Sequence, residues 1–307
     1  PVITGAATGD RTVTEESDLT AGGTLTIVDV DAGQSAFAPV ASGTTTYGTY
    51  TLDAAGVWTY ALNNANATVQ ALAMGALLSD SFTAVSQDGT ATQLVTLSIT
   101  GTNDVPVITG ETAGDRAVKE ELDLSASGAL SIVDADAGQS AFAAVVGGTT
   151  TFGTYTLAAN GNWTYSLNNG LAAVQALSEG QQLADSFTAV SQDGTAMRVV
   201  LLAISGTNDG VVITSAAPAG TVTEDANSTA SASDSLVATG VVTFSDLDVN
   251  DTHTASFSGN PQYGTFVLGA LTDTVNGLGG SQGYTYTLNN DSAAVQALGE
   301  GDTLTEL

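Results

Sequence analysis

Apolar and polar residues alternate along several short stretches of this chain, and the alternation has a period of two. In one such stretch Trp58, Tyr60 and Leu62 are separated by Thr59 and Ala61. Successive side chains of a β-strand point to opposite faces, so each stretch has one apolar face and one polar face. This pattern is typical of an antiparallel sheet that packs against a core on one side only. Helical periodicity is nearly absent.

Turn residues separate the alternating stretches at intervals of about 8–12 positions. In the first part of the chain the pattern predicts strands at 11–14, 24–28, 47–52, 57–62, 81–86 and 92–100, with one or two more in the loops. Asp53-Ala54-Ala55-Gly56 is predicted to be a hairpin turn, and Val69-Gln70-Ala71-Leu72 a single helical turn. About seven short strands in about 105 residues predict an immunoglobulin-like antiparallel β-sandwich.

The whole pattern is repeated along the chain. Pro1-Val2-Ile3-Thr4-Gly5 returns as Pro106-Val107-Ile108-Thr109-Gly110, and Trp58 returns as Trp163. A third, more divergent copy begins near Val211. A unit of this length can bury a core of its own, unlike the short units of solenoids. We therefore predict three tandem β-sandwich domains, at residues 1–104, 105–209 and 210–307.

The third domain is expected to be incomplete at its C-terminal end. Glu306-Leu307 align with Asp185-Ser186, so the counterpart of 187–209 is missing from the chain. Neither a signal peptide nor an apolar run long enough to span a bilayer is present. We expect the chain to be a segment of a longer protein, with its localisation signals outside the segment and no direct insertion into a membrane.

The chain is strongly acidic, with 32 carboxylates and a net charge of -28. Its four cations are Arg11, Arg116, Lys119 and Arg198. Nucleic acids and anionic membranes bind clustered Lys and Arg, so neither is expected as a partner. The acidic residues are either a solvated surface charge or ligands for a hard cation. Because the chain has no cysteine, disulfides and thiolate metal sites are excluded.

The acidic residues form three stations that keep their places from copy to copy. In the first copy these are Val13-Thr14-Glu15-Glu16, then Asp29-Val30-Asp31, then Asp88 with Asn103-Asp104. The stations recur at Glu120, Glu121, Asp134, Asp136, Asp193, Asn208 and Asp209, and at Glu224, Asp246 and Asp248 in the third copy. A ligand should hold its register between copies, whereas a solvating charge can drift.

Calcium is the cation that these stations favour. It takes six to eight oxygen ligands, mostly from carboxylates, asparagine side chains and backbone carbonyls. Carboxylates that lie close together repel one another unless a cation lies among them. An EF-hand is not supported, because position twelve counted from Asp134 is Val145 rather than glutamate. The glycine-rich repeats of calcium-binding β-rolls are also absent.

In combination, these features resemble the VCBS repeats of giant bacterial surface and RTX adhesins and, more distantly, a cadherin repeat. The resemblance rests on Val-x-Glu near the start, Asp-x-Asp after the second strand, Gly56-Val57-Trp58-Thr59-Tyr60 in the hairpin, Gln87-Asp88-Gly89, and Thr102-Asn103-Asp104-Val105-Pro106 at the boundary. It covers the first two copies and most of the third. It implies a tandem cadherin-like fold, an extracellular or bacterial cell-surface location, and calcium between neighbouring repeats.

The resemblance also implies which residues would bind the ions. In cadherins the glutamate comes from the earlier domain, the Asn-Asp from the linker, and the Asp-x-Asp and late aspartate from the later domain. The first junction would then use Glu15, Glu16, Asn103, Asp104, Asp134, Asp136 and Asp193. The second would use Glu120, Glu121, Asn208, Asp209, Asp246 and Asp248. Asp29, Asp31 and Asp88 would face a preceding domain.

The chain departs from the cadherin pattern in three places. The acidic station before the late strand is Glu179 in the second copy but Met74 in the first. In the third copy the Asp-x-Asp begins 37 residues after Asp209, against 30 residues from Asp104 to Asp134, and the late aspartate is missing.

The expected function is therefore a calcium-rigidified extender, or stalk, of a large secreted bacterial adhesin that supports cell adhesion or biofilm formation. Its partners would be the neighbouring repeats of the same chain. The alternative is an array of carbohydrate- or ligand-binding modules, in which Trp58 and Trp163 would be exposed stacking platforms. We predict no enzymatic activity, because the one histidine, His253, has no counterpart in the other copies and tandem copies of an active site would be unusual.

Overall fold

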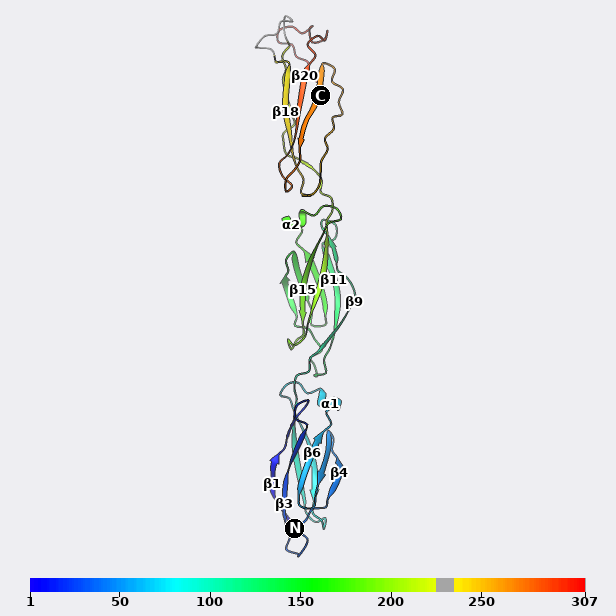
Figure 1. Cartoon of the computed structure of the whole chain (residues 1–307), viewed down its shortest axis with the longest axis vertical. Helices are drawn as coiled ribbons and strands as arrows, with labels where there is room; N and C mark the ends of the chain where they lie inside the picture. Colours follow the sequence, from blue (N-terminus) through cyan, green and yellow to red (C-terminus); the bar gives the residue numbers. More distant parts are fainter. Residues whose placement is uncertain (225–234, 307) are drawn as a thin grey trace.

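The structure is a computed structural model that describes residues 1–224 and 235–306, except for the side chains of 4–8 and 111–113. It shows tandem β-sandwiches strung end to end as a rod, with the two chain termini in opposite end units (Figure 1). The order of the units along the rod follows the order of the three sequence copies. No described helix is long and apolar enough to cross a membrane.

The first sandwich packs a five-stranded sheet against a three-stranded sheet. The five-stranded sheet contains, in spatial order, β1 (Val2–Asp10), β3 (Thr20–Val28), β6 (Val57–Leu62), β5 (Gly48–Leu52) and β4 (Val40–Thr44). The three-stranded sheet contains β2 (Thr12–Thr14), β8 (Thr92–Thr100) and β7 (Leu77–Val85). All neighbours are antiparallel except β2 and β8, which are parallel. The helical turn α1 (Ala67–Gln70) lies between β6 and β7.

The second sandwich repeats this topology. Its five-stranded sheet contains β9 (Val107–Asp115), β11 (Ser125–Val133), β14 (Asn162–Leu167), β13 (Gly153–Leu157) and β12 (Val145–Thr149). Its three-stranded sheet contains β10 (Ala117–Lys119), β16 (Met197–Ser205) and β15 (Gln182–Val190), and α2 (Ala172–Gln175) is the helical turn. In the third copy the described residues form one four-stranded sheet of β17 (Val212–Ile213), β18 (Val237–Ser245), β20 (Gly280–Leu288) and β19 (Gly264–Thr272).

The strands predicted from alternation are all present, although several ends differ. The strand predicted at 24–28 begins at Thr20, and the one predicted at 81–86 is β7, Leu77–Val85. The helical turn begins at Ala67, two residues before its predicted start. Two further strands, β1 and β4, lie outside the strands predicted by alternation, as expected for the loops. Alternation does not reveal them because their sequences are rich in small residues, which give no contrast between faces.

The alternating aromatic residues belong to the core. Trp58 is 0% exposed and Trp163 is 3% exposed. Phe82 of the opposite sheet stacks on Tyr50 with a centroid distance of 4.3 Å and meets Trp58 at 5.6 Å. Because an aromatic platform for a sugar must be open to solvent, neither tryptophan can serve as one in this fold.

This burial predicts how the protein will fluoresce. Iodide, which does not penetrate a packed core, should quench the emission of the native chain only slightly, and unfolding in urea should make both tryptophans accessible. Stern–Volmer titrations of the native and the urea-unfolded chain provide the measurement. Native quenching as strong as that of the unfolded chain would contradict the packing and would revive the carbohydrate-binding alternative.

A buried carboxylate joins the two sheets in each of the first two copies. Asp80, on β7, accepts hydrogen bonds from the Thr45 hydroxyl at 2.5 Å, the Tyr60 hydroxyl at 2.9 Å and the Tyr47 N–H at 3.0 Å. Asp185 accepts the equivalent bonds in the second copy. In the third copy Glu306 accepts from the Tyr286 hydroxyl and the Tyr263 N–H, which confirms its alignment with Asp185.

Candidate metal centres at the repeat junctions

Three carboxylates from distant parts of the chain meet at the first junction. Glu15 follows β2, Asp104 lies in the linker between β8 and β9, and Asp136 lies in the loop after β11. Each offers an oxygen, and the three oxygens lie within 4.8 Å of one another. The cluster thus includes one residue from the first sandwich, one from the linker and one from the second sandwich.

Backbone hydrogen bonds position these carboxylates. Glu15 Oε1 accepts the Thr102 N–H at 2.7 Å, and Asp136 Oδ2 accepts the Asp104 N–H at 3.0 Å. Both bonds run between the linker and a sandwich, so the linker is tied to the unit before it and to the unit after it. A direct contact between the sandwiches adds to this, because the N–H of Ala137 donates to the carbonyl of Ala71 at 3.2 Å.

The other predicted ligands lie around this cluster. Asn103 Nδ2 donates to Asp193 Oδ2 at 3.0 Å, which joins the linker to the late aspartate of the second sandwich. Asp134 Oδ1 accepts the N–H of Asp136 at 3.0 Å. The structure therefore brings the Asp-x-Asp, the Asn-Asp and the late aspartate to the same junction.

Several carboxylate oxygens at this junction are buried without a hydrogen-bond donor. They are Glu15 Oε2, Asp104 Oδ2, Asp134 Oδ2 and Asp136 Oδ1. Glu15 is 0% exposed and Asp136 is 1% exposed, so solvent does not compensate them. A buried charge without a partner is strongly unfavourable, and buried polar atoms in proteins are almost always paired. A cation among these four oxygens would compensate their charge.

Electrostatic crowding is visible in the pKa values of the same groups. Burial, followed by the charges of Glu16, Asp136 and Glu15, raises the pKa of Asp104 to about 6. Burial also raises the pKa of Glu15, and Asp136 adds to that shift by repulsion. Glu16 is exposed, and its charge contributes to the raised pKa values of Asp104 and Asp136.

The second junction has the same arrangement. Glu120, Asp209 and Asp248 each offer an oxygen within 4.8 Å of the others. The Thr207 N–H donates to Glu120 Oε1 at 3.3 Å, and the Asp209 N–H donates to Asp248 Oδ2 at 2.6 Å. Glu120 Oε2, Asp209 Oδ2 and Asp248 Oδ1 are buried without a donor. Burial and then the charge of Glu121 raise the pKa of Asp209 to about 6.

The surroundings of the Asp-x-Asp differ between the two junctions. The N–H of Asp134 donates to the hydroxyl of Ser140 at 2.9 Å. Asp246, the equivalent residue, instead has one carboxylate oxygen 2.8 Å from His253 Nε2, and His253 Nδ1 lies 2.5 Å from Asp273. Sequence reasoning missed this role of His253, since a residue unique to one copy gives no repeat signal.

The remaining acidic stations lie apart from the two clusters. Asp29 lies 3.4 Å from the amino group of Pro1, and the N–H of Asp31 donates to Asp29. This pair is therefore at the N-terminal end of the first sandwich, opposite the linker (Figure 1). Asp88 accepts hydrogen bonds from Ser86 and Thr90 within its own turn. Glu179 pairs with Lys119 at 3.3 Å and takes no part in the acidic clusters.

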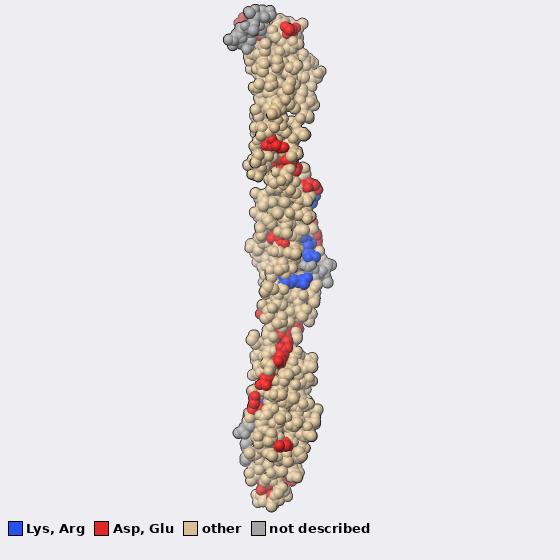
Figure 2. Space-filling model, viewed as in Figure 1, with Lys and Arg blue, Asp and Glu red and all other residues tan. Residues whose placement is uncertain are grey.

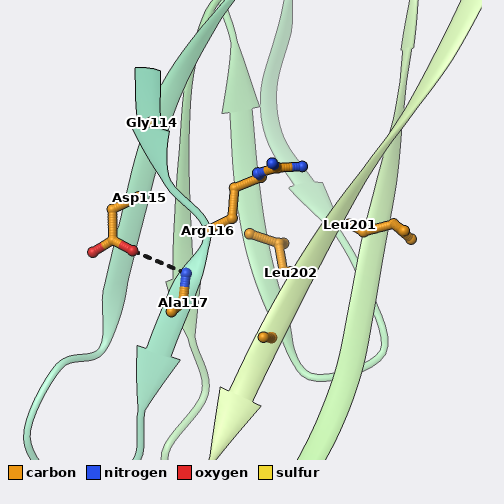
Figure 3. Close-up of a pocket in the computed structure, with 7 residues that line it drawn as sticks. Gly114, Asp115, Arg116, Ala117, Leu201 and Leu202 are labelled. Carbon is orange, nitrogen blue, oxygen red and sulfur yellow. Dashed lines mark hydrogen bonds between the residues drawn. The ribbon is translucent and has the colours of Figure 1, made fainter. Parts of the chain in front are cut away.

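The surface shows the same distribution of charge. Figure 2 shows groups of red acidic atoms at the two levels of the rod where one unit meets the next, besides others along the units, and most of the blue atoms in view lie on the middle unit. A depression of about 460 Å³ lies on the second sandwich, among Gly114, Asp115, Arg116, Ala117 and 201–203 (Figure 3). It contains none of the clustered carboxylates, and Asp115 in it accepts the N–H of Ala117 at 3.0 Å.

Comparison with known proteins relates the first part of the chain to a protein family. Residues 1–101 match the bacterial cadherin-like domain, which is about a third of the chain. No curated protein sequence matches the chain.

Solved structures with a similar arrangement include two protocadherins and a fragment of titin. An extracellular fragment of protocadherin gammaB7, described as a cis-dimer, is 11% identical with a TM-score of 0.44, over 92% of this chain and 65% of that one. The protocadherin gammaB4 extracellular domain is 15% identical with a TM-score of 0.40, over 92% of this chain and 43% of that one. The I-band fragment of titin is 8% identical with a TM-score of 0.38, over 95% of this chain and 89% of that one. Identities and TM-scores this low say nothing about function.

Proposed function

We propose that this chain is a calcium-rigidified stalk segment of a large secreted bacterial surface adhesin of the VCBS and RTX type, which supports cell adhesion or biofilm formation. The observation that carries the proposal is the set of buried carboxylate oxygens without donors at both junctions. The bacterial cadherin-like match of residues 1–101 supports an extracellular, adhesion-type module. The domain boundaries that go with the proposal are 1–104, 105–209 and 210–307.

The donor set fits calcium. Calcium takes hard oxygen ligands in a flexible shell of six to eight, and these junctions offer carboxylates and asparagine oxygens without thiols. The imidazole of His253 lies beside Asp246, and both of its nitrogens already face carboxylates. When bound, calcium would supply two positive charges to a cluster whose carboxylates repel one another. Extracellular modules bind calcium with dissociation constants of about 10⁻⁴–10⁻³ M, which suits an ion taken up only outside the cell.

The residues of the first junction would stiffen the rod because they belong to three separate pieces. Glu15 belongs to the first sandwich, Asn103 and Asp104 to the linker, and Asp136 to the second sandwich. If all of these residues bind one calcium ion, the two sandwiches cannot rotate about the linker. Without the ion, repulsion among Glu15, Asp104 and Asp136 favours separation of the two sandwiches.

Fluorescence transfer between dyes on the first and second sandwiches tests this proposal. The chain has no cysteine, so one introduced cysteine in each sandwich gives a unique pair of labels. Millimolar calcium should lengthen and narrow the distance distribution, and a chelator should reverse the change. Magnesium should substitute poorly, because it demands a smaller octahedral shell. A distribution that calcium does not change would leave a flexible acidic tether as the better account.

A further inference from the structure

Two glutamates at the junctions have an unusual backbone conformation. Glu16 has a φ of 61° and Glu121 a φ of 60°, which places both in the left-handed region. Among the described residues that are not glycine, only Asn276 shares a positive φ. The left-handed region is unfavourable for a residue with a Cβ, and such residues persist only where the surrounding structure holds them.

One asparagine in each copy holds this conformation. The N–H of Glu16 donates to Asn64 Oδ1 at 2.9 Å, and the N–H of Glu121 donates to Asn169 Oδ1 at 3.0 Å. Each asparagine lies 48 residues further along the chain. Asn64 is in the loop between β6 and α1, and Asn169 is in the loop between β14 and α2. The same bond with the same geometry therefore forms in two sandwiches.

The left-handed residue stands next to a carboxylate of the junction cluster. Glu15 is buried with its side chain against the linker, and in an extended strand the next side chain would point to the opposite face. The left-handed φ of Glu16 breaks this alternation, so its exposed side chain is not directed to the face opposite Glu15. Glu121 has the same conformation beside Glu120.

We propose that Asn64 and Asn169 are positioning residues for the junction cations: each holds the adjacent glutamate backbone in the left-handed conformation, so that Glu16 and Glu121 serve as ligands together with Glu15 and Glu120. This inference rests on the calcium binding proposed above. In this proposal neither asparagine is itself a ligand. Each acts through the glutamate whose N–H it accepts.

Calcium titration of the full chain and of its alanine variants tests the inference. Fluorescence transfer between dyes on the first and second units reports calcium affinity at the first junction. Dyes on the second and third units report it at the second junction. Asn64→Ala should weaken calcium binding at the first junction by about tenfold and leave the second unchanged, since outer-shell partners of metal ligands typically contribute about 10- to 100-fold. Asn169→Ala should do the reverse. Asn64→Asp, which keeps the acceptor oxygen, should keep at least the parent affinity at the first junction.

Asn66→Ala is the matched control, because Asn66 lies in the same loop but caps the helical turn by accepting the Thr68 N–H. It should lower the unfolding midpoint measured in chelator without changing calcium affinity. A purely structural Asn64 would behave in the same way. In a Glu16→Gly background, which removes both the strain and the carboxylate, Asn64→Ala should have no further effect on affinity.

The outcomes separate the two proposals. If the parent chain binds calcium and Asn64→Ala leaves its affinity unchanged, the positioning role is wrong and the stalk proposal stands. If Asn64→Ala weakens calcium binding equally with and without Glu16, the asparagine does not act through that glutamate and the inference is also wrong. A parent chain that binds no calcium at either junction overturns both.

Discussion

Replacing Asp80 by alanine should lower the free energy of unfolding of the first sandwich by about 3 kcal/mol. The change leaves the Tyr60 hydroxyl and the Tyr47 N–H without their acceptor, and each buried donor left unpaired costs about 1–3 kcal/mol. Urea unfolding of the full chain, followed by tryptophan fluorescence in a Trp163→Phe background, reports on Trp58 and hence on the first sandwich. Asp80 is 5% exposed, so solvent can replace the lost bonds only after local opening.

Asp185→Ala is the matched control, since Asp185 makes the equivalent bonds in the second sandwich. With Trp58 as the reporter, it should leave the transition of the first sandwich in place. Asp80→Glu should be milder than alanine, because Glu306 fills this position in the third copy. A first transition that is the same for Asp80→Ala and the parent would show that the buried carboxylate does not stabilise the sandwich.

The contribution of Asp80 should also depend on pH. Burial alone would raise the pKa of Asp80, but hydrogen bonds from Thr45, Tyr60 and the Tyr47 N–H outweigh it and lower the pKa. The unfolded chain, with an aspartate pKa of about 3.9, therefore binds this proton at a higher pH than the folded chain does. The stabilisation is fully present above that pH and is lost as the pH falls through the lowered folded value. In Asp80→Asn, the free energy of unfolding of the first sandwich should fall less steeply than in the parent as the pH decreases below about 4.

Asp136→Asn should weaken calcium binding at the first junction by about a hundredfold or more. The substitution preserves size and can still accept the Asp104 N–H, but it removes one of three clustered negative charges. Outer-shell partners alone contribute about 10- to 100-fold to metal affinity, so a direct ligand should contribute at least as much. Calcium titration of the dye pair on the first and second sandwiches measures this affinity.

The folded sandwiches should tolerate the same substitution in the absence of calcium. Asp136 lies in the loop after β11 and not among the residues of the hydrophobic core. The loss of its charge relieves repulsion among the clustered carboxylates, so the urea midpoint in chelator should not fall. Asp31→Asn is the control, because Asp31 holds the equivalent place in the first copy and lies by Asp29 and the amino terminus, outside both acidic clusters. Parent-like calcium affinity in Asp136→Asn would remove this residue from the ligand set.

Alternation and repetition in the sequence were enough to predict the tandem sandwiches. Trp58, Tyr60 and Leu62 share a strand face because a strand has a period of two, and all three are in the core. That rule is local, so it applies before any tertiary contact forms. It did not give the positions of β1 and β4, the further strands expected in the loops, because small residues give no contrast between the faces. It also gave no role to Asp80, whose polar side chain lies on an apolar face.

The acidic stations were also visible in the sequence, since Glu15, Asp104 and Asp136 keep their register between copies. The sequence by itself thus determined the fold class, the repeat and the residues eligible to bind a cation. Only the tertiary structure decided that these three oxygens lie within 4.8 Å of one another, that His253 lies beside Asp246, and that Asn64 holds Glu16 in a left-handed conformation. Each of these contacts joins segments that are distant in the chain or outside the repeat pattern. The distance between such segments depends on how whole sheets and linkers pack, which no local periodicity encodes.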